Sequence, residues 1–262
     1  MADRILGSTD SAPQFRVKLA ENQEELEAAQ RLRYRVFVQE LGADGPLVDH
    51  ERGLETDRFD AHFDHLILQS EDRPGEVVGV YRLLRDDQAA KIGQFYSEDE
   101  YDLEVLKSSG RRIMELGRSC LDPAFRGGTA MYHLWNSLAR YVSKHKIEIL
   151  FGVASFHGTD PAPLAPALSL LHHRHLAPES LRPRARAEHY QDMNLLDEAA
   201  LDRRAAMVQV PALIKAYLRL GGYVGEGAYI DHRFNTTDIC LVMDTARMRQ
   251  AQKNIYTKGV AT

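Results

Sequence analysis

The chain of 262 residues is 44% hydrophobic and 27% charged, with a formal net charge of −5 and a sequence pI near 6.1. This is the composition of a globular protein with an ample core, and it offers no electrostatic basis for nucleic acid as a partner. No apolar run approaches the roughly 20 residues of a membrane span, and the N-terminus lacks a signal-peptide pattern. We therefore expect a protein that is not integral to a membrane and that binds no nucleic acid. Its two cysteines, both in apolar runs, indicate a reducing, cytoplasmic setting.

The composition along the chain predicts a single domain over residues 15–248. Residues 1–14 are small and polar, and we expect them to form a flexible arm, with residues 249–262 as a C-terminal tail. Cys120 and Cys240 are the only cysteines, and both lie in apolar, strand-like runs. This pattern predicts reduced core residues and not a disulfide.

The first third of the chain predicts a strand, a helix and a hairpin. Residues 15–19 alternate like a strand, and residues 21–37 carry apolar side chains at helical spacing. Residues 42–55 lack periodicity and predict a loop. Residues 65–69 and 76–84 flank a Pro-Gly turn, which predicts an antiparallel hairpin.

The centre of the chain predicts a β-α-β unit. Residues 90–110 are mixed and acidic, and we expect them to be irregular with one short helix. A strand pattern at 114–121 leads into the turn 126–128, a helix with an apolar stripe at 131–142, and a strand at 149–156. Glycines beside a helix start let backbone N–H groups bind phosphate, although a plain left-handed connection explains them equally well.

The last third begins with a change of composition. Residues 157–207 are rich in proline and arginine, and we predict an insertion with one short helix at 164–174. Residues 211–220 predict a helix that begins at a proline and ends at two glycines. Strand patterns follow at 223–234 and 238–244.

Glu115 and Arg118 stand out because they occupy an apolar strand. Glu115 lies between Met114 and Leu116, where a carboxylate must be paired, protonated or used in chemistry. Residues 115 and 118 of a regular strand point to opposite faces, so a direct pair requires a bulge, for which Gly117 is suited. Apolar neighbours would raise the pKa of Glu115 and Arg118 would lower it. A structural ion pair and a catalytic base are equally consistent with this pattern.

Two further clusters carry charge. Glu55, Asp57 and Asp60 follow a long loop and suit a cationic group of a substrate, or else form a solvated loop edge. The histidine run at 172–175 matches no zinc spacing, so we expect an exposed basic patch and no metal. Arginines over residues 174–186 extend that patch, which would attract an acidic protein or lipid head groups.

The β-α-β unit with its glycine turn resembles the pantetheine-binding core of the GNAT acyltransferase superfamily. The resemblance implies an α/β (α+β) fold, with a central mixed β-sheet flanked by helices and the insertion 157–207 after the second core strand. The superfamily motif reads Gln or Arg, two residues, Gly, one residue, then Gly or Ala. In the run that starts at Arg126, Thr129 stands where the first of these glycines belongs.

Four separated motifs resemble those of acyl-homoserine-lactone synthases, in the same order. They are Arg33-Tyr-Arg-Val-Phe37, Glu55-Thr-Asp57-Arg-Phe-Asp60, the strand around Arg82, and Glu115-Leu-Gly-Arg118. The tryptophan that follows the Val-Phe segment in those synthases is missing here. Their donors are acyl chains on acyl carrier protein, so the likeness implies that source.

A likeness over residues 15–245 is to the bacterial, hemolysin-like ornithine acyltransferases that make lyso-ornithine lipid. It is carried by Glu115-Leu-Gly-Arg-Ser-Cys-Leu-Asp-Pro123, Leu150-Phe-Gly-Val-Ala-Ser-Phe156, Tyr217-Leu-Arg-Leu-Gly221 and Asp231-His-Arg-Phe-Asn-Thr-Thr-Asp238. The resemblance implies transfer of a fatty acyl group, 3-hydroxylated in that family, from acyl carrier protein to the α-amine of L-ornithine. Lipid biosynthesis would then be the setting.

This reaction assigns catalytic roles to the buried strand. A protonated amine must lose a proton before it attacks a thioester, and Glu115 is the leading base, directly or through a water. Arg118 is the second catalytic candidate. The oxyanion formed by the attack would be stabilised by a backbone N–H near Cys120 or Leu121. The thiol leaving group is acidic enough to need no strong general acid.

The substrates would bind around that strand. We expect Glu55, Asp57 and Asp60 to hold the amines of ornithine and Arg82 or Arg118 to pair with its carboxylate. Arg33 joins this substrate-binding set through its motif. The phosphopantetheine-binding residues would be Arg126, Gly127, Gly128 and Thr129. Phe95, Phe151 and Phe156 suggest an apolar groove for the acyl chain.

Thr129 in place of a glycine, with the acidic motif upstream, favours carrier-bound 4'-phosphopantetheine over free coenzyme A. We expect this group as a co-substrate and no permanently bound cofactor. Three alternatives stay open: acylation of another amino acid, homoserine lactone synthesis, and a non-catalytic module that binds lipid or carrier protein. The apolar product and the arginine-rich insertion also suggest peripheral contact with an anionic membrane, at the inner face.

Overall fold

The computed structural model describes residues 14–247. The predicted tail and all but the last residue of the predicted arm lie outside these residues. The strands are β1 (Phe15–Leu19), β2 (Val48–Asp49), β3 (Leu54–Glu55), β4 (Asp64–Ser70), β5 (Val77–Arg85), β6 (Tyr101–Asp102), β7 (Ile113–Leu121), β8 (Ile149–His157), β9 (Arg184–Ala185), β10 (Tyr190–Gln191), β11 (Tyr223–Val224), β12 (Ala228–Asp231) and β13 (Thr236–Asp244). The α-helices are α1 (Gln23–Arg33), α2 (Asp86–Ile92), α3 (Glu104–Lys107), α4 (Ala130–His145), α5 (Ala165–His175), α6 (Arg203–Gln209) and α7 (Ala212–Arg219).

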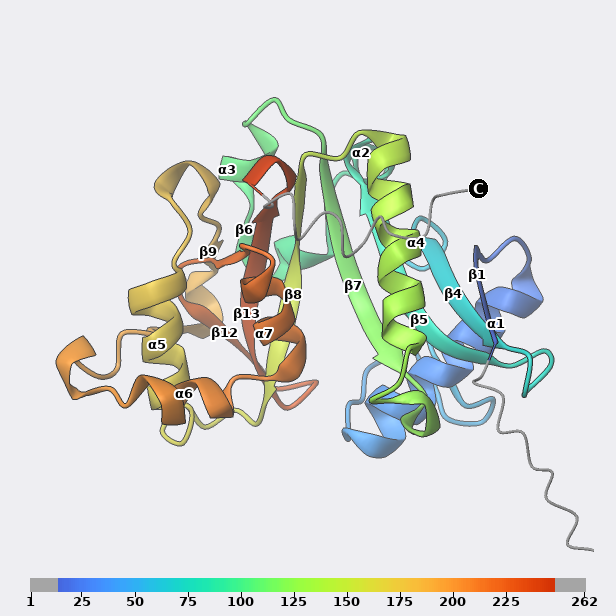
Figure 1. Ribbon diagram of the computed structural model, residues 1–262, viewed down its shortest axis with the longest axis horizontal. Helices are drawn as coiled ribbons and strands as arrows, with labels where there is room; N and C mark the ends of the chain where they lie inside the picture. The colour runs from blue at the N-terminus through green and yellow to red at the C-terminus, as the bar shows by residue number, and fades with distance from the viewer. Residues whose placement is uncertain (1–13, 248–262) are drawn as a thin grey trace, which may run out of the picture.

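One mixed sheet organises the described part of the chain (Figure 1). Within residues 14–247 it has nine strands in the order β1-β4-β5-β7-β8-β13-β12-β10, with β11 paired to β13. Strands β7 and β8 are parallel, and helix α4 connects them. Every other pairing in this sheet is antiparallel among the described strands. The predicted central mixed sheet flanked by helices is confirmed.

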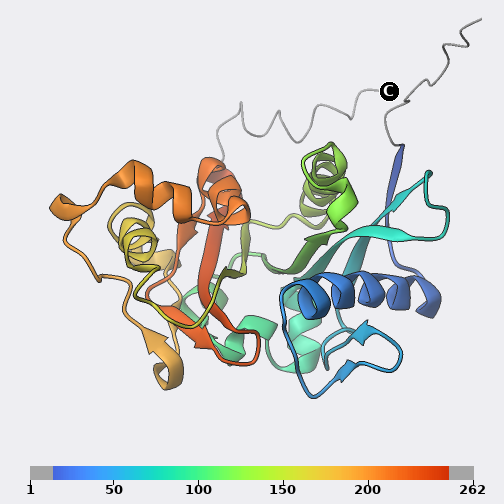
Figure 2. The ribbon, with the colours of Figure 1, turned by 90° about the horizontal axis from the view of Figure 1, so that it is seen from below.

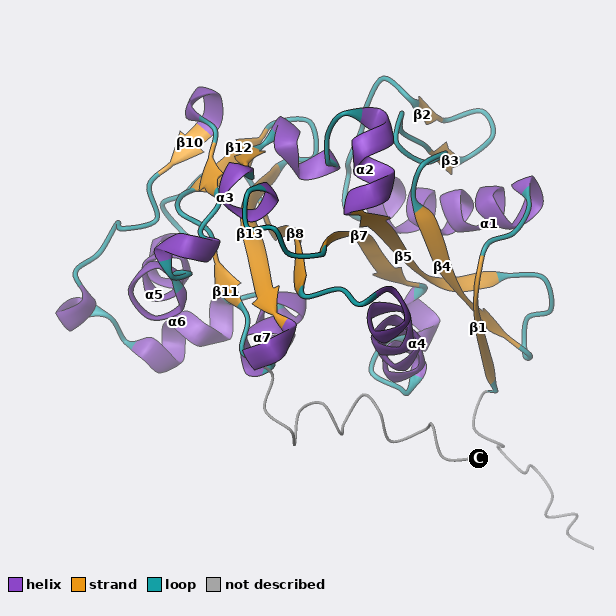
Figure 3. Ribbon diagram, turned by 90° about the horizontal axis from the view of Figure 1, so that it is seen from above, coloured by secondary structure: helices purple, strands orange, loops and turns teal. Residues whose placement is uncertain are grey.

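Helices cover both faces of the sheet. Helix α1 packs on β5 and β7 from one face, and α4 packs on β1, β4 and β5 from the other. Figure 2 shows these helices on opposite sides of the sheet, and Figure 3 shows β10 and β12 at the end far from β1. Helix α1 begins at Asn22, whose side chain accepts a hydrogen bond from the N–H of Glu25, and it buries Ala29 and Leu32 against the sheet. It continues as a π-helix over Tyr34–Glu40.

Outside the insertion, the structure departs from the predicted elements in three places. The predicted loop 42–55 contains the small hairpin β2–β3, and the predicted irregular stretch 90–110 contains η2 (Tyr96–Asp99), β6 and α3. The predicted strand 223–234 is divided into β11 and β12 because Gly227 has a φ of 73°, a conformation that interrupts an extended strand. These pieces are too short to carry a periodic signal.

The insertion has more structure than the one short helix that was predicted for it, since it contains α5, the start of α6 and the strands β9 and β10. Its β10 extends the sheet edge by pairing with β12, and its β9 pairs with β6. Cys120 and Cys240 are buried and free, as predicted. Within the described residues, no helix is long and apolar enough to cross a membrane.

Candidate active site

The site opens where β7 and β8 separate. Each strand has nine residues, yet they pair only at Ile113 with Ile149, Met114 with Leu150, and Glu115 with Phe151. Beyond Glu115 the two strands diverge, and the space between them is a cavity of about 300 Å³. A gap in a parallel pair exposes backbone groups and side chains that an intact sheet would cover.

A β-bulge lies beside this gap. Val80 pairs with Cys120 and Arg82 pairs with Gly117, so Arg118 and Ser119 together face Tyr81. Arg118 has a φ of 49°, in the left-handed region that residues other than glycine rarely adopt. The bulge therefore lies one residue beyond the predicted Gly117. Its consequence is the one expected: the side chains of Glu115 and Arg118 both line the cavity.

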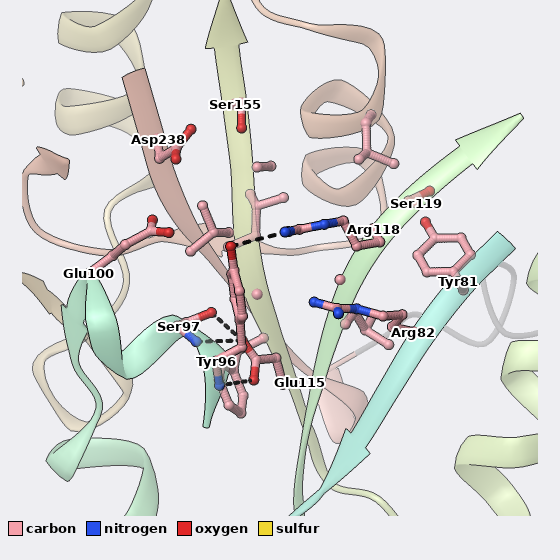
Figure 4. A pocket seen from close by; sticks show the side chains of 18 of the residues that line it. Tyr81, Arg82, Tyr96, Ser97, Glu100, Glu115, Arg118, Ser119, Ser155 and Asp238 are labelled. Atoms are coloured by element: carbon pink, nitrogen blue, oxygen red, sulfur yellow. Dashed lines mark hydrogen bonds between the residues drawn. The ribbon is translucent and has the colours of Figure 1, made fainter. Parts of the chain in front are cut away.

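The cavity is polar on one part of its wall and apolar on another (Figure 4). Its charged lining residues are Arg82, Glu100, Glu115, Arg118, Asp231 and Asp238. Its apolar lining residues include Phe37, Leu116, Leu150, Phe151, Leu213 and Met243. Such a lining suits a substrate that joins a charged head to a hydrocarbon chain.

Glu115 is buried and held by hydrogen bonds. Its Oε1 accepts from the N–H of Ser97 at 2.7 Å and from the Ser97 hydroxyl, and its Oε2 accepts from the N–H of Tyr96 at 2.7 Å. Burial raises the pKa of Glu115 to about 7, against the opposing effect of these hydrogen bonds. The sequence left the direction of this shift open, and the structure makes it upward.

Arg118 pairs with groups other than Glu115. Its Nε donates to Glu55 at 3.2 Å, its Nη1 donates to the hydroxyl of Tyr96 at 3.2 Å, and its Nη2 lies 3.6 Å from Asp57. The guanidinium also stands over the ring of Phe234 at 5.0 Å. Of the two alternatives that the sequence left open for Glu115, the direct ion pair with Arg118 does not form, because the guanidinium pairs with the acidic motif.

The acidic motif forms a buried ion-pair network and not a solvated loop edge. Glu55 pairs with Arg33 and Arg118, Asp60 pairs with Arg33 and Arg82 at 2.7 Å each, and Asp57 pairs with Arg82. Although burial opposes it, the charges of Arg118 and Arg33 lower the pKa of Glu55 to about 2. A substrate amine would have to displace a guanidinium to reach these carboxylates. They also lie outside the described lining of the cavity.

The two buried arginines of this network differ in their access to the cavity. Arg33 is fully buried and is not among the described lining residues, so it can reach a substrate only through the carboxylates that it holds. Arg82 lines the cavity, and its Nη1 donates to Asp57 and Asp60. Its Nε and Nη2 have no hydrogen-bond partner within residues 14–247. Arg82 therefore has donors to offer a ligand.

The glycine turn lies at the end of β7, outside the described lining of the cavity. Gly127 has a φ of 79°, and the side chain of Thr129 makes no capping hydrogen bond at the start of α4. The N–H groups of the first helical turn are therefore without a side-chain cap. Arg126 is engaged, since it donates to Glu40 at 2.6 and 2.7 Å and to the carbonyl of Leu121.

Two predicted features lie elsewhere. Cys120 and Leu121 pair with Val80 and Gly79, and neither is among the described residues that line the cavity. Gly117, Arg118 and Ser119 form that wall instead. Of the three phenylalanines predicted for the acyl groove, only Phe151 is found among the described lining residues, and Phe95 packs edge-on against it at 5.0 Å. Phe156 is buried in the main core.

Sequence reasoning missed several residues of the cavity wall. Tyr96 and Ser97 bind Glu115 from a stretch that we predicted to be irregular, and Ser97 carries no sequence signal. Glu100 lies in the same acidic stretch. Asp231 and Asp238 are the first and last residues of the C-terminal segment that carries the family likeness. Membership of this segment was the one sequence feature that could have indicated them.

Comparison with known proteins identifies relatives of this chain. Residues 32–136 match the acetyltransferase (GNAT) domain family. The chain is 58% identical to an L-ornithine N(alpha)-acyltransferase of Rhodobacter capsulatus over 250 residues, which is 94% of this chain and 96% of that one. It is 40% identical to the enzyme of the same name from Brucella abortus, over 96% of this chain and 91% of that one.

Similarity to solved structures is evidence for the fold of this chain and not for its function. The AHL synthase LasI aligns with a TM-score of 0.53 and 16% identity, over 96% of this chain and 98% of that one. The CoA-dependent acyl-homoserine lactone synthase BjaI aligns with a TM-score of 0.53 and 13% identity, over 94% of this chain and 89% of that one. With identity over nearly the whole length of named relatives, this chain belongs to the L-ornithine N(alpha)-acyltransferase family, and it is an acyltransferase of GNAT type.

Proposed function

We propose that this protein transfers a 3-hydroxyacyl group from acyl carrier protein to the α-amine of L-ornithine. The observation that carries the proposal is Glu115, a buried carboxyl group with a pKa of about 7 at the point where β7 and β8 separate. The relatives named for N(alpha)-acylation of L-ornithine supply the substrate. A carboxylate of this pKa can take a proton from an amine near neutral pH.

Glu115 has room for one more proton donor. A carboxylate oxygen accepts two hydrogen bonds, and Oε2 of Glu115 accepts only one from the described residues, from Tyr96. The free lone pair would receive the amine proton, directly or through a water. The deprotonated amine then attacks the thioester carbon, and the C–S bond breaks as the tetrahedral intermediate collapses. The nitrogen's second proton passes to the leaving thiolate, so the products are the amide and the free thiol of the donor.

The bulge would stabilise the oxyanion of that intermediate. A bulge leaves the N–H of its extra residue outside the strand ladder, and this bulge lies at Arg118 and Ser119 in the cavity wall. We propose this segment in place of Cys120 and Leu121. The unpartnered Nε and Nη2 of Arg82 would bind the substrate carboxylate, for which the flat guanidinium is well shaped.

The glycine turn would bind the phosphate of the donor. The uncapped N–H groups at the start of α4 and the open space around Gly127 and Gly128 support an anion site there. The acyl chain would lie along the apolar wall between β8 and α7, where Leu150 and Leu213 line the cavity. Carrier-bound phosphopantetheine, and not free coenzyme A, is the donor that we propose.

Release of free thiol tests this proposal. The full chain would be supplied with a 3-hydroxyacyl carrier protein or with the same acyl group on coenzyme A, together with a panel of amino acids. We expect thiol release with ornithine and the carrier protein. Release with another amine, but not with ornithine, would show that the substrate is wrong, and faster turnover of the coenzyme A thioester would show that the donor is wrong. No release with any amine would favour a binding module.

Peripheral membrane contact is a separate part of the proposal. The apolar product and the exposed arginines of the insertion motivate it, but Arg174 pairs with Glu198 and Arg184 pairs with Glu226, which reduces the positive charge offered to lipid. Sedimentation with vesicles that contain anionic lipid would decide the matter. Equal recovery of the protein with neutral and anionic vesicles would remove membrane contact from the proposal.

A further inference from the structure

Three carboxyl groups meet in the wall of the cavity, away from the acidic motif. Glu100 follows η2, Asp231 ends β12, and Asp238 lies on β13. One oxygen of each lies within 4.8 Å of the others, and all three residues line the cavity. Figure 4 shows Glu100 and Asp238 on one side of the cavity and Arg82 on the opposite side.

Two of these groups are buried without full hydrogen bonding. Glu100 is 6% exposed and Asp238 is 3% exposed. Oε2 of Glu100 and Oδ1 of Asp238 have no hydrogen-bond partner among the described residues. Asp231 is held by the backbone N–H groups of Arg233 and Phe234, at 2.7 and 3.1 Å. A buried carboxylate oxygen without a donor costs free energy, so a cationic group that supplies N–H donors would be bound favourably here.

The pKa values of Glu100 and Asp238 are raised, as expected for carboxyl groups that are buried close together. Burial and the charges of Asp238 and Asp231 raise the pKa of Glu100 well above its usual value. Burial raises the pKa of Asp238 to about 6, although Ser155 and Thr236 oppose the shift. Arg118 faces both groups and lowers both pKa values. The guanidinium does not satisfy them, because its own ion pairs are with Glu55 and Asp57.

The cavity therefore has a cationic side and an anionic side. Arg82 and Arg118 come from β5 and β7, whereas Asp231 and Asp238 come from β12 and β13, on the other side of the gap in the sheet. A molecule with a carboxylate at one end and an ammonium group at the other matches this arrangement. A divalent cation alone would satisfy the anionic side and leave the donors of Arg82 without a partner.

We propose that Glu100, Asp231 and Asp238 bind the side-chain ammonium of a diamino acid substrate, an inference that rests on the function proposed above. An alkylammonium carries three N–H donors, one for each carboxyl group. The side-chain amine is the more basic of the two and keeps its charge near pH 7, whereas the α-amine loses its proton more easily. The cluster would thus hold the amine that stays charged and leave the α-amine for Glu115.

The test compares two substrates that differ by one amine. Norvaline has the carbon skeleton of ornithine without the side-chain amine. We expect the wild-type chain to prefer ornithine in kcat/KM. In Glu100→Gln and in Asp238→Asn, kcat/KM for ornithine should fall at least about tenfold, mainly because KM rises. The kcat/KM for norvaline should not change. Asp99→Asn, an exposed carboxylate on η2, is the matched control and should behave as wild type.

Binding measured by calorimetry on the full chain separates this inference from the proposed function. Ornithine that binds more tightly than norvaline but is not acylated would refute the function and keep the cation site. If the variants lose the same affinity for ornithine and for norvaline, the cluster does not bind the side-chain ammonium. Tight binding of Mg²⁺ or Mn²⁺ that the variants abolish would also contradict the inference.

Wild-type protein alone provides a last measurement, which is needed if both variants fail to fold. The preference for ornithine over norvaline in binding should grow as pH rises through about 6, where Asp238 loses its proton. Deprotonation supplies the negative charge that an ammonium group needs. A preference that does not change with pH between 5 and 7 would contradict the inference.

Discussion

Two opposing effects set the pKa of Glu115. Burial raises its pKa, hydrogen bonds from Ser97 and Tyr96 lower it, and the balance is a pKa of about 7. A general base works best when its pKa is near the working pH, because it is then both available and strong enough to accept a proton. The same three hydrogen bonds fix its orientation in the cavity wall.

Removing the base should abolish most turnover. Glu115→Gln keeps the shape and loses the proton acceptor, so we expect kcat/KM to fall at least about a hundredfold. In the wild-type protein, kcat/KM should rise as pH increases through about 7, because Glu115 loses its proton. This rising limb of the pH–rate profile should be absent in the variant. A loss of tenfold or less with intact circular dichroism would assign Glu115 a structural role.

Ser97 offers a finer test of the same group. Its hydroxyl hydrogen bond stabilises the charged form of Glu115 and lowers the pKa, so Ser97→Ala should raise that pKa. The limb of the pH–rate profile should then move to higher pH, while the rate at its plateau is retained. An unmoved limb would mean that another group produces it.

At the scale of elements, the site depends on strands that begin as a pair and then separate. Gly152 makes this possible, because a Cβ at this position would lie 2.1 Å from the carbonyl oxygen of Leu116. Only glycine lets β8 approach β7 at the point where they diverge. The bulge at Arg118 then directs its side chain and that of Glu115 to one cavity.

Gly152→Ala should therefore weaken the contact between β7 and β8. Since the added methyl group meets backbone and not a flexible side chain, we expect a loss of about 1–3 kcal/mol in the free energy of unfolding. Urea denaturation measures it. Gly128→Ala is the control, because Gly128 has no positive φ and no atom within 4 Å of the added Cβ. Equal midpoints for the two variants would contradict this account of Gly152.

The start of α4 can be tested by charge. Gly128→Asp places a carboxylate beside the proposed phosphate site, and we expect the KM for acyl carrier protein to rise on the order of tenfold with little change in kcat. Gly128→Ala again serves as the uncharged control. If the charged variant binds the donor as well as the control does, the phosphate lies elsewhere.

At the scale of the whole molecule, the buried ion-pair network ties the N-terminal helix to the sheet. Arg33 belongs to α1, Glu55 to β3, Arg82 to β5 and Arg118 to β7. The network lies directly behind the cavity wall, since Arg82 and Arg118 belong to both. Its carboxylates thus position the two arginines that line the cavity.

Stability should fall in acid because of this network. The pKa of Glu55 is about 2 in the folded protein and near 4.5 in the unfolded chain, so the unfolded chain binds more protons between these pH values. The free energy of unfolding should then decrease by about 3 kcal/mol from this group as pH falls from 4.5 to 2. Urea denaturation across this range should show a shallower decline in Glu55→Gln. An equal decline would remove Glu55 as a source of the acid sensitivity.

The local elements followed from the sequence because hydrophobic periodicity records which face of a helix or strand is buried. Strand β7, helix α4 and strand β8 were predicted on that basis, and the motifs around Arg82, Glu115 and Arg118 identified residues of the cavity wall. The family likeness rested on the same short segments. The divided strand at Gly227 and the short pieces β2, β3 and β6 escaped this reasoning, since they are shorter than a periodic signal.

Only the tertiary structure shows which carboxylates pair with which arginines. Glu55, Asp57 and Asp60 look like a substrate site in the sequence, but three arginines from distant segments already hold them. Glu100, Asp231 and Asp238 line the cavity instead, and Glu100 lies more than a hundred residues before the other two in the sequence. The reason is physical: a carboxylate is recognised by the donors that fold around it, and these are set by long-range packing, which local patterns of sequence do not record.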